Sequence, residues 1–291
     1  MRLYYYKDPR GNFGDDLNEW LWPRLIGDLI KHDHPYLAYN DVSQTDESDT
    51  LFIGVGSLLN TNVPAEPRKV VMGAGVAYGE PPKVDDKWSI YAVRGPRSAE
   101  AMGLDPSLAV TDSGMLVRAI DLPKPEKAYP VSFFSYHETA ELIDWQGPCS
   151  SVGLHHIDPA GDVDHVLDQI QRSELLVTEA MHGAIIADAL RVPWVPVKIF
   201  QSINEFKWMD WCESLRLEYD FHKVAHLGPR SFKGLKGTAR RLIKPKQICK
   251  ELKRIAATSV PKLSEESVLD DAIGRLLAEI DRLKSDRASN A

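Results

Sequence analysis

One segment combines residues that could bind an anion and move a proton. Residues 178–184 read Thr-Glu-Ala-Met-His-Gly-Ala and follow a short apolar run that predicts a buried strand. At the start of the helix expected next, free backbone N–H groups and the helix dipole favour a phosphate or carboxylate. His182 could transfer a proton near neutral pH, Glu179 could contact the substrate, and Gly183 would keep the backbone open to it. Alternatively, His182 satisfies a buried polar group and Glu179 is a capping acid.

A second candidate is an arginine at the end of another predicted strand. Arg94 precedes Gly95-Pro96 in the run Val-Arg-Gly-Pro-Arg-Ser, and this pair cannot continue a strand. The guanidinium fork of Arg94 suits a carboxylate or phosphate in a two-point contact. For Arg97 we prefer a surface salt bridge, and Ser98 is a candidate helix cap.

Two loops with glycine supply further candidates. Residues 11–16 follow the first predicted strand, and there Asn12 and Asp15 could bind sugar hydroxyls or orient a nucleophile. Asp15 could equally be a helix cap with no chemistry. Gly56 and Ser57 end a later apolar run and are substrate-binding candidates. The glycine spacing matches neither a dinucleotide-binding fingerprint nor a phosphate loop, so it gives only weak support for nucleotide binding.

Two more polar residues lie at predicted strand ends. His137 in Ser-Tyr-His is a further substrate-binding candidate, and Asp112 in Thr-Asp-Ser-Gly is another candidate of the same kind. A structural role is the alternative for both. His155 and His156 lack a third ligand at a suitable spacing, so we expect no metal ion.

The elements that must position these residues are predicted by short, continuous apolar runs. In the first half they span residues 50–57, 69–75 and 89–95. In the second half they span residues 131–137, 150–157, 174–178 and 194–199. Such runs are typical of parallel strands buried on both faces. Because the candidates follow these runs, we expect them at the carboxyl edges of the sheets, where ligands bind in open α/β folds.

A proline-rich segment divides the chain. Residues 122–130 contain three prolines and indicate a linker. We therefore predict an α/β fold in which two Rossmann-like domains, residues 1–121 and 131–228, face a cleft. The tail, residues 229–291, differs: a basic segment precedes a helix that Ser264 caps and that runs to about Asp286, with a narrow apolar stripe.

The basic segment of the tail suggests a surface for anions. From Arg230 to Arg254 there are ten lysines and arginines and one acid, Glu251. Such a segment could bind an anionic membrane surface. RNA is the rival partner, but Phe232 is the one aromatic side chain available for stacking, so no nucleic acid is expected. An ordinary solvated face is the third interpretation.

The overall composition narrows the class of protein. The 291 residues are 43% apolar and 26% charged, with a net charge of −7, as in a water-soluble globular protein that is not built for nucleic acid. Three widely spaced cysteines form no metal or redox motif and fit a reduced compartment. We see neither a signal peptide nor an apolar run of ~20 residues. The expected location is the cytoplasm, either free or on the inner face of the plasma membrane.

Taken together, the motifs resemble the polysaccharide pyruvyl transferase family, especially the bacterial succinoglycan-type enzymes that form pyruvate ketals. The resemblance covers about residues 1–200 and rests on Gly-Asn-Phe-Gly-Asp-Asp-Leu-Asn, Leu-Phe-Ile-Gly-Val-Gly-Ser, Val-Arg-Gly-Pro-Arg-Ser and Thr-Glu-Ala-Met-His-Gly. The last corresponds to the family signature Thr-Glu-x-x-His-Gly. Ala180-Met181 stand where the family often has Arg-Leu, which removes one possible phosphate contact.

The resemblance implies a fold like that of the two-domain (GT-B) glycosyltransferases, with the donor phosphoenolpyruvate in the interdomain cleft. The acceptor would be a sugar of an exopolysaccharide or lipid-linked oligosaccharide, and the product a cyclic pyruvate ketal plus phosphate, with no cofactor. His182 corresponds to the family histidine and Arg94 to its donor-binding arginine. In this hypothesis Arg94 and the helix start at Gly183 each hold one anion of the donor. Protonated His182 is the acid, and Asp15 or Glu179 accepts the hydroxyl proton.

Two other functions fit the same sequence. A nucleotide-sugar glycosyltransferase would share the two-domain plan and bind a uridine or cytidine nucleotide. A non-catalytic anion- or sugar-binding protein would keep the cleft without turnover. Binding of phosphoenolpyruvate rather than nucleotides, together with release of phosphate, would separate the three.

Overall fold

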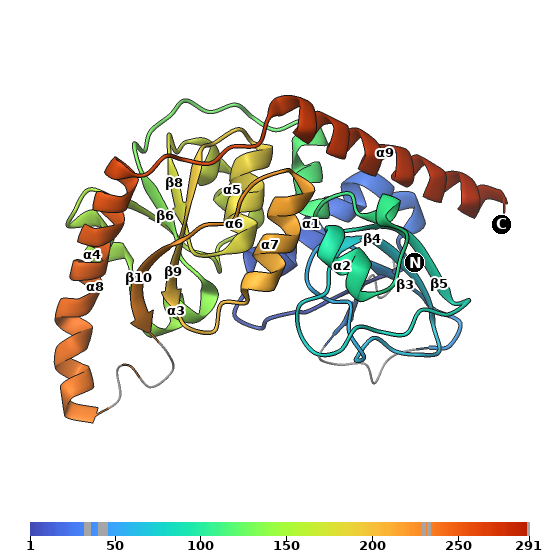
Figure 1. The fold of residues 1–291 in the computed structure, drawn as a ribbon, viewed down its shortest axis with the longest axis horizontal. Helices are drawn as coiled ribbons and strands as arrows, with labels where there is room; N and C mark the ends of the chain where they lie inside the picture. The colour runs from blue at the N-terminus through green and yellow to red at the C-terminus, as the bar shows by residue number, and fades with distance from the viewer. Residues whose placement is uncertain (32–35, 40–45, 228–230, 232–233, 290–291) are drawn as a thin grey trace.

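The chain folds into two lobes of similar plan, each a parallel sheet flanked by helices (Figure 1). This arrangement is a computed structural model that describes residues 1–31, 36–39, 46–227, 231 and 234–289. The predicted α/β fold with two Rossmann-like halves and a C-terminal helix is confirmed. The first sheet and its helices end at Ala119, and the second sheet begins at Ser132.

Lobe 1 holds a five-stranded sheet in the order β2-β1-β3-β4-β5, with every pairing parallel. Its strands are β1 (Arg2–Tyr5), β2 (Tyr36–Ala38), β3 (Thr50–Ile53), β4 (Arg68–Ala74) and β5 (Trp88–Val93). Its helices are α1 (Phe13–Ile26), α2 (Pro96–Ala101) and the 3-10 helices η1 (Gly27–Leu29), η2 (Pro106–Leu108) and η3 (Ser113–Ala119). The buried apolar residues of β1, β3 and β4 explain why these strands read as continuous runs: both faces are covered.

Lobe 2 holds a second five-stranded parallel sheet, in the order β10-β9-β8-β6-β7. Its strands are β6 (Ser132–Phe134), β7 (His155–Ile157), β8 (Leu176–Thr178), β9 (Trp194–Phe200) and β10 (His222–Leu227). Its helices are α3 (His137–Leu142), α4 (Gln146–Ser150), α5 (Val163–Gln171), α6 (Met181–Ala189) and α7 (Glu205–Ser214).

The two sheets share one topology. Numbered within its own lobe, each runs in the order second, first, third, fourth and fifth strand. The strand order therefore reverses between β1 and β3 in lobe 1 and between β6 and β8 in lobe 2. Ligands in open α/β sheets bind outside the carboxyl ends of the strands at this reversal point.

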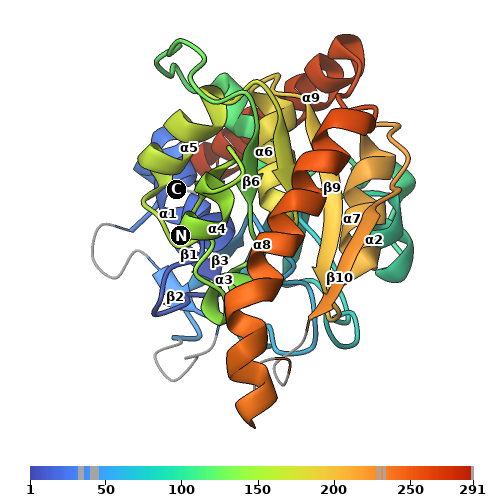
Figure 2. The same ribbon diagram turned by 90° about the vertical axis from the view of Figure 1, so that its left-hand side faces the viewer.

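The C-terminal part of the chain first covers lobe 2 and then returns to lobe 1. Helix α8 (Gly234–Thr258) packs on α4 and β10, and Figure 2 shows it running across that lobe. Helix α9 (Glu266–Ser289) packs on β4, β5 and η3 of lobe 1. The buried face of α9 is made of Leu269, Ala272, Ile273, Leu276, Ile280 and Leu283.

The predicted basic segment is only partly covered by this description. Residues 230 and 232–233, and the side chains of residues 234–242, lie outside the described part, so membrane binding by this segment stays a prediction. Within the described residues, no helix combines the length and apolarity needed to cross a bilayer.

A short strap, residues 259–265, carries the chain from α8 to α9. The backbones of Lys262 and Trp194 exchange two hydrogen bonds of 2.7 and 3.0 Å. The buried Asp188 carboxylate accepts hydrogen bonds from the Ser264 backbone N–H (3.0 Å), the Ser264 hydroxyl and the Trp194 indole. Ser264, which we expected to cap the final helix, is thus held by Asp188, and the helix begins at Glu266. The strap makes a second covalent crossing between the lobes.

Candidate active site between the lobes

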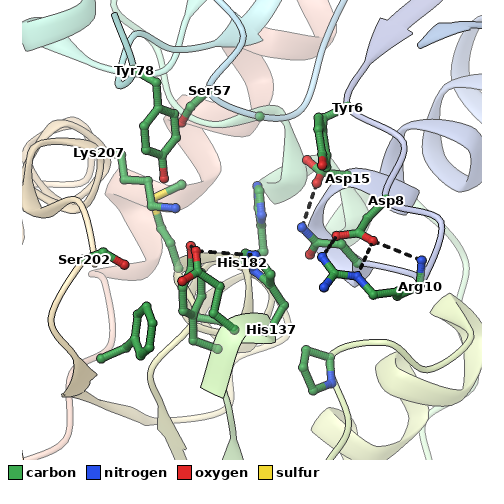
Figure 3. Close-up of a pocket in the computed structure, with 18 of the residues that line it drawn as sticks. Tyr6, Asp8, Arg10, Asp15, Ser57, Tyr78, His137, His182, Ser202 and Lys207 are labelled. Atoms are coloured by element: carbon green, nitrogen blue, oxygen red, sulfur yellow. Dashed lines mark hydrogen bonds and ion pairs between the residues drawn. The ribbon is translucent and has the colours of Figure 1, made fainter. Parts of the chain in front are cut away.

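A cavity of about 710 Å³ lies between the lobes, with both polar and apolar side chains in its lining, and its walls are mainly the loops that follow the strands of both sheets. Its lining includes Asn12, Asp15, Gly56, Ser57, Tyr78, His137, His182 and Lys207. Figure 3 shows Lys207 on one side of the cavity and Asp15 on the other, with His182 and His137 between them. Six residues predicted from strand ends thus meet at one cavity: Asn12, Asp15, Gly56, Ser57, His137 and His182.

His182 enters the cavity from the start of a nearly completely buried helix. Strand β8 ends at Thr178, whose hydroxyl bridges the N–H and C=O of Ala180 and so shapes the turn into α6. His182 is the second residue of α6. Desolvation, with Lys207 and Arg94 nearby, lowers the pKa of His182 to about 3. The imidazole is therefore neutral at pH 7 when the cavity holds no anion.

The Nδ1 edge of the His182 ring packs against Gly14 of α1. A Cβ atom at position 14 would lie 2.0 Å from His182 Nδ1, a distance that no packing arrangement tolerates. Since Gly14 is helical, its importance lies in this close approach between the two lobes and not in backbone freedom.

We expect Gly14→Ala to lower turnover by at least about 100-fold, because a displacement of ~1 Å in a reacting group has that effect. The turnover rate at saturating substrate measures the effect. Gly27→Ala is the matched control, since a Cβ there meets no atom within 4 Å. A Gly14→Ala enzyme with the activity of the control would show that the His182 ring need not stay where it lies.

Asn12 and Asp15 divide the roles that the sequence left open. Asn12 caps α1 by accepting a hydrogen bond from the Gly14 N–H, and its side-chain N–H₂ donates to Asp15 Oδ2 at 2.6 Å. Asp15 is thus free of the capping role and faces the cavity. Desolvation raises its pKa to about 7, although the Lys207 charge and the Asn12 hydrogen bond oppose the shift. A substantial fraction of Asp15 therefore carries a proton at neutral pH.

Lys207 is a cavity residue that the sequence did not indicate. It projects from α7, and the part of the chain that the structure describes gives it no ion-paired carboxylate. Its ammonium lies 5.8 and 5.9 Å from the ring centres of Tyr78 and Tyr136. Together with desolvation, its charge lowers the pKa of His137 to about 4. No motif surrounds Lys207 in the sequence, and only the packing of α7 brings it here.

Arg94 lies behind the cavity wall rather than in it. Its side chain is fully buried, and its Nε donates to Asp210 Oδ2 of α7 at 2.9 Å. The two terminal nitrogens donate to the Ser57 hydroxyl and the Val76 carbonyl, both at 2.6 Å. The two-point contact expected with a donor anion is thus replaced by contacts within the protein, one of which links the lobes. Arg94 is placed to hold Ser57 in the cavity wall.

Glu179 is likewise buried and fully hydrogen-bonded. Its Oε1 accepts from the backbone N–H groups of Ile199 and Phe200 at 2.9 and 2.6 Å. Its Oε2 accepts from the Thr139 hydroxyl at 2.7 Å and the Tyr136 N–H at 3.3 Å. Desolvation raises the pKa of Glu179 to about 7. These contacts join the ends of three strands, so Glu179 shapes the cavity without lining it.

Gly183 also has a packing role. A Cβ at this position would lie 2.6 Å from Thr178 Oγ1 and 3.1 Å from the Phe134 ring. The missing side chain therefore lets α6 approach its own sheet closely, whereas we expected it to open the backbone to a ligand. Gly56, by contrast, does line the cavity and has a φ of +123°, which favours glycine.

Two facing parallel sheets with a cavity at their switch points define a two-lobed α/β protein with a candidate active site between the lobes. Comparison with known proteins specifies it further. The sequence model described as polysaccharide pyruvyl transferase matches residues 3–199. The succinoglycan biosynthesis protein ExoV of Rhizobium meliloti is 41% identical over 230 residues, which cover 77% of this chain and 68% of that protein.

The chain belongs to the polysaccharide pyruvyl transferase family, and it is an enzyme of that class. The resemblance stated from the four sequence motifs is thereby confirmed. Among the described residues, no group of three His, Cys, Asp or Glu side chains could hold a metal ion.

Proposed function

We propose that this enzyme transfers the pyruvyl group of phosphoenolpyruvate to a sugar of an exopolysaccharide or lipid-linked oligosaccharide, forming a cyclic ketal and releasing phosphate. The observation that carries the proposal is the interlobe cavity, where a lysine without a paired carboxylate among the described residues, a protonatable aspartate and a neutral histidine meet. A small donor with two anionic groups needs such a fixed positive charge.

Lys207 is the cation best placed for the donor. Arg94 is already engaged with Asp210, and the exposed Arg10 pairs with Asp8 and Glu141 at the cavity margin. Lys207 has a carboxylate partner neither in α7 nor elsewhere in the described chain. We therefore assign the donor phosphate to Lys207. The family often has Arg-Leu where this chain has Ala180-Met181. Lys207 supplies from α7 the positive charge that is missing there.

The environments of two side chains suggest the proton transfers. Buried titratable groups whose pKa values are pushed in opposite directions commonly divide the roles of acid and base. Neutral His182 takes the proton of the first acceptor hydroxyl, and the raised pKa of Asp15 makes it the acid. This order reverses the roles suggested from the sequence.

Bonds and protons balance in this transfer. The acceptor oxygen bonds to C2 of the donor while C3 gains a proton from Asp15, and the C2=C3 double bond becomes single. The second hydroxyl bonds to C2 as the C–O bond to phosphate breaks, which closes the ring. Of the two hydroxyl protons, one replaces the proton given to C3 and the other leaves with phosphate.

The acceptor sugar can enter past a tyrosine-rich wall. Tyr6, Tyr39 and Tyr78 line the lobe 1 side of the cavity and combine an apolar ring with a polar hydroxyl, which suits a sugar. A smaller pocket of about 210 Å³ continues from the same cavity beside Arg10 and Glu141. It offers space for further sugar units of a longer acceptor.

Replacing Lys207 tests the donor assignment. Because hydrogen bonds to charged groups contribute about 1.5–3 kcal/mol, Lys207→Gln should weaken phosphoenolpyruvate binding by roughly 10- to 150-fold. Isothermal titration with phosphoenolpyruvate measures it, and Lys250→Gln on the exposed face of α8 is the control. Equal affinity in both variants would remove Lys207 from the donor site.

A second assay decides the reaction itself. Wild-type enzyme, phosphoenolpyruvate and a panel of lipid-linked oligosaccharides should yield phosphate and a sugar whose mass rises by one pyruvate ketal. Binding of a uridine or cytidine nucleotide instead would favour a glycosyltransferase. Binding of phosphoenolpyruvate without phosphate release from any acceptor would favour a non-catalytic protein.

A further inference from the structure

Two buried polar atoms face each other without a hydrogen-bond partner in the described structure. They are Oδ2 of Asp112 and Nε2 of His182, and 4.0 Å separates them. Asp112 is completely buried, so its free oxygen has no access to water. An unpaired buried polar group is costly and uncommon in native proteins. Two such atoms aimed at each other beside a cavity indicate a pair that acts together.

The fold fixes the Asp112 carboxylate with one oxygen in use and the other free. Asp112 caps the 3-10 helix η3, and its Oδ1 accepts a hydrogen bond from the Gly114 N–H at 2.8 Å. Helix η3 packs on α6, the helix that carries His182. The cap therefore belongs to lobe 1 and the imidazole to lobe 2, and the closed contact between the lobes brings them together.

Neither of the cations near Asp112 and His182 takes the place of one of them as a hydrogen-bond partner. Arg94 and Lys207 are the nearby cations, but the Arg94 guanidinium is held by Asp210 and Lys207 faces the cavity. Neither forms a hydrogen bond with Asp112 or His182 in the described structure. For a protonated His182 Nε2, the Asp112 carboxylate is thus the nearest anionic acceptor.

We propose that Asp112 is a positioning residue that acts through His182. Its Oδ2 accepts the Nε2–H of the neutral ring, which leaves Nδ1 without a proton and able to take one from the acceptor hydroxyl. After that transfer, both ring nitrogens carry protons and the carboxylate stabilises the imidazolium. A hydrogen bond needs the atoms to approach by about 1 Å. The assignment rests on the proposed function for the role of His182.

The variant Asp112→Asn separates this role from the cap. Asparagine keeps Oδ1 for the Gly114 N–H and replaces the free oxygen with an N–H₂ group that cannot accept a hydrogen bond. Asp105→Asn is the matched control, because Asp105 caps η2 in the same way, accepting from the Ser107 N–H at 2.8 Å on the exposed surface. Both variants should unfold at similar temperatures.

We expect Asp112→Asn to lower kcat at least about 100-fold while KM for phosphoenolpyruvate stays within about threefold. A comparable aspartate-to-asparagine change in a serine protease triad, which leaves the wrong histidine tautomer, lowers kcat by about 10⁴. Asp105→Asn should behave as wild type. An Asp112→Asn enzyme with wild-type kcat, or with an effect confined to KM, overturns the proposal.

A spectroscopic measurement needs no donor. In protein with ¹⁵N-labelled histidine, the neutral His182 ring should carry its proton on Nε2 in the wild type and on Nδ1 in Asp112→Asn. A wild-type ring protonated on Nδ1 overturns the proposal even if the variant does not fold. The expected tautomers together with an enzyme that releases no phosphate from phosphoenolpyruvate would keep the pair and reject the proposed function.

Discussion

Replacing His182 with alanine is expected to lower kcat for phosphate release from phosphoenolpyruvate by about 10²- to 10⁴-fold, the usual contribution of a positioned acid or base. The reason lies in the site: the ring is neutral, it lines the cavity, and its Nδ1 edge is kept clear by Gly14. Donor binding depends mainly on Lys207 in this scheme. The variant should therefore bind phosphoenolpyruvate within a few-fold of the wild-type affinity.

The control for this experiment is another histidine outside the cavity. His165 lies on the exposed face of α5, and His165→Ala should leave kcat unchanged. His137 is not a suitable control, because it lines the same cavity. If His182→Ala retains more than about a tenth of the wild-type kcat, another group carries the proton and the proposed division between His182 and Asp15 is wrong.

The second large effect concerns stability. We expect Arg94→Ala to lower the free energy of unfolding by about 3–5 kcal/mol, because it leaves the Asp210 charge buried without its partner. Both side chains are fully buried, and Asp210 also accepts hydrogen bonds from the N–H and hydroxyl of Ser98 at 2.9 and 2.5 Å. Urea unfolding monitored by circular dichroism measures the change. A loss below about 1 kcal/mol would show that the pair is not buried in solution.

A neighbouring ion pair on the protein surface is the control. Arg97 and Glu213 form an ion pair at the exposed edge of the α2–α7 contact. Surface pairs of this kind contribute about 0–1 kcal/mol, so Arg97→Ala should have a small effect. Both pairs join an arginine near the start of α2 to a carboxylate of α7, but only the Arg94–Asp210 pair is buried. The difference in stability between the two variants therefore measures the effect of burial.

A double variant distinguishes an interlobe contact from a donor-binding residue. Replacing both partners, as in Arg94→Met with Asp210→Asn, removes the two charges together, keeps an acceptor oxygen for Ser98, and should recover part of the stability lost in Arg94→Ala. If Arg94 serves the fold alone, the double variant binds phosphoenolpyruvate with an affinity close to that of the wild type. A stable double variant that cannot bind phosphoenolpyruvate would return Arg94 to the donor site that the family resemblance implies.

The sequence predicts the sheets and the location of the site for one physical reason. Buried parallel strands must be continuously apolar, and polar residues that follow them must gather at the carboxyl edges. This logic places Asn12, Ser57, His137 and His182 at one cavity. This prediction needs only local patterns. The packing of the two lobes against each other then brings the loops face to face.

The same logic cannot tell a side chain that faces a ligand from one that faces the protein. Arg94 and Glu179 stand at strand ends as predicted, yet their partners, Asp210 and the N–H groups of β9, come from distant segments. Lys207 shows the converse, since an ordinary lysine of α7 becomes a cavity residue through tertiary packing alone. Pairing across the fold decides these cases, and a single sequence does not record it.

The return of α9 to lobe 1 has a consequence for how the nascent chain matures. Lobe 1 is translated first, but the apolar surface of β4, β5 and η3 is covered only when α9 has left the ribosome. At about 5–20 residues per second, the interval between Ala119 and Leu283 lasts roughly ten to thirty seconds. During this time lobe 2 can complete its sheet while lobe 1 still exposes an apolar surface. The lobe that is synthesised first is therefore the last to complete its fold.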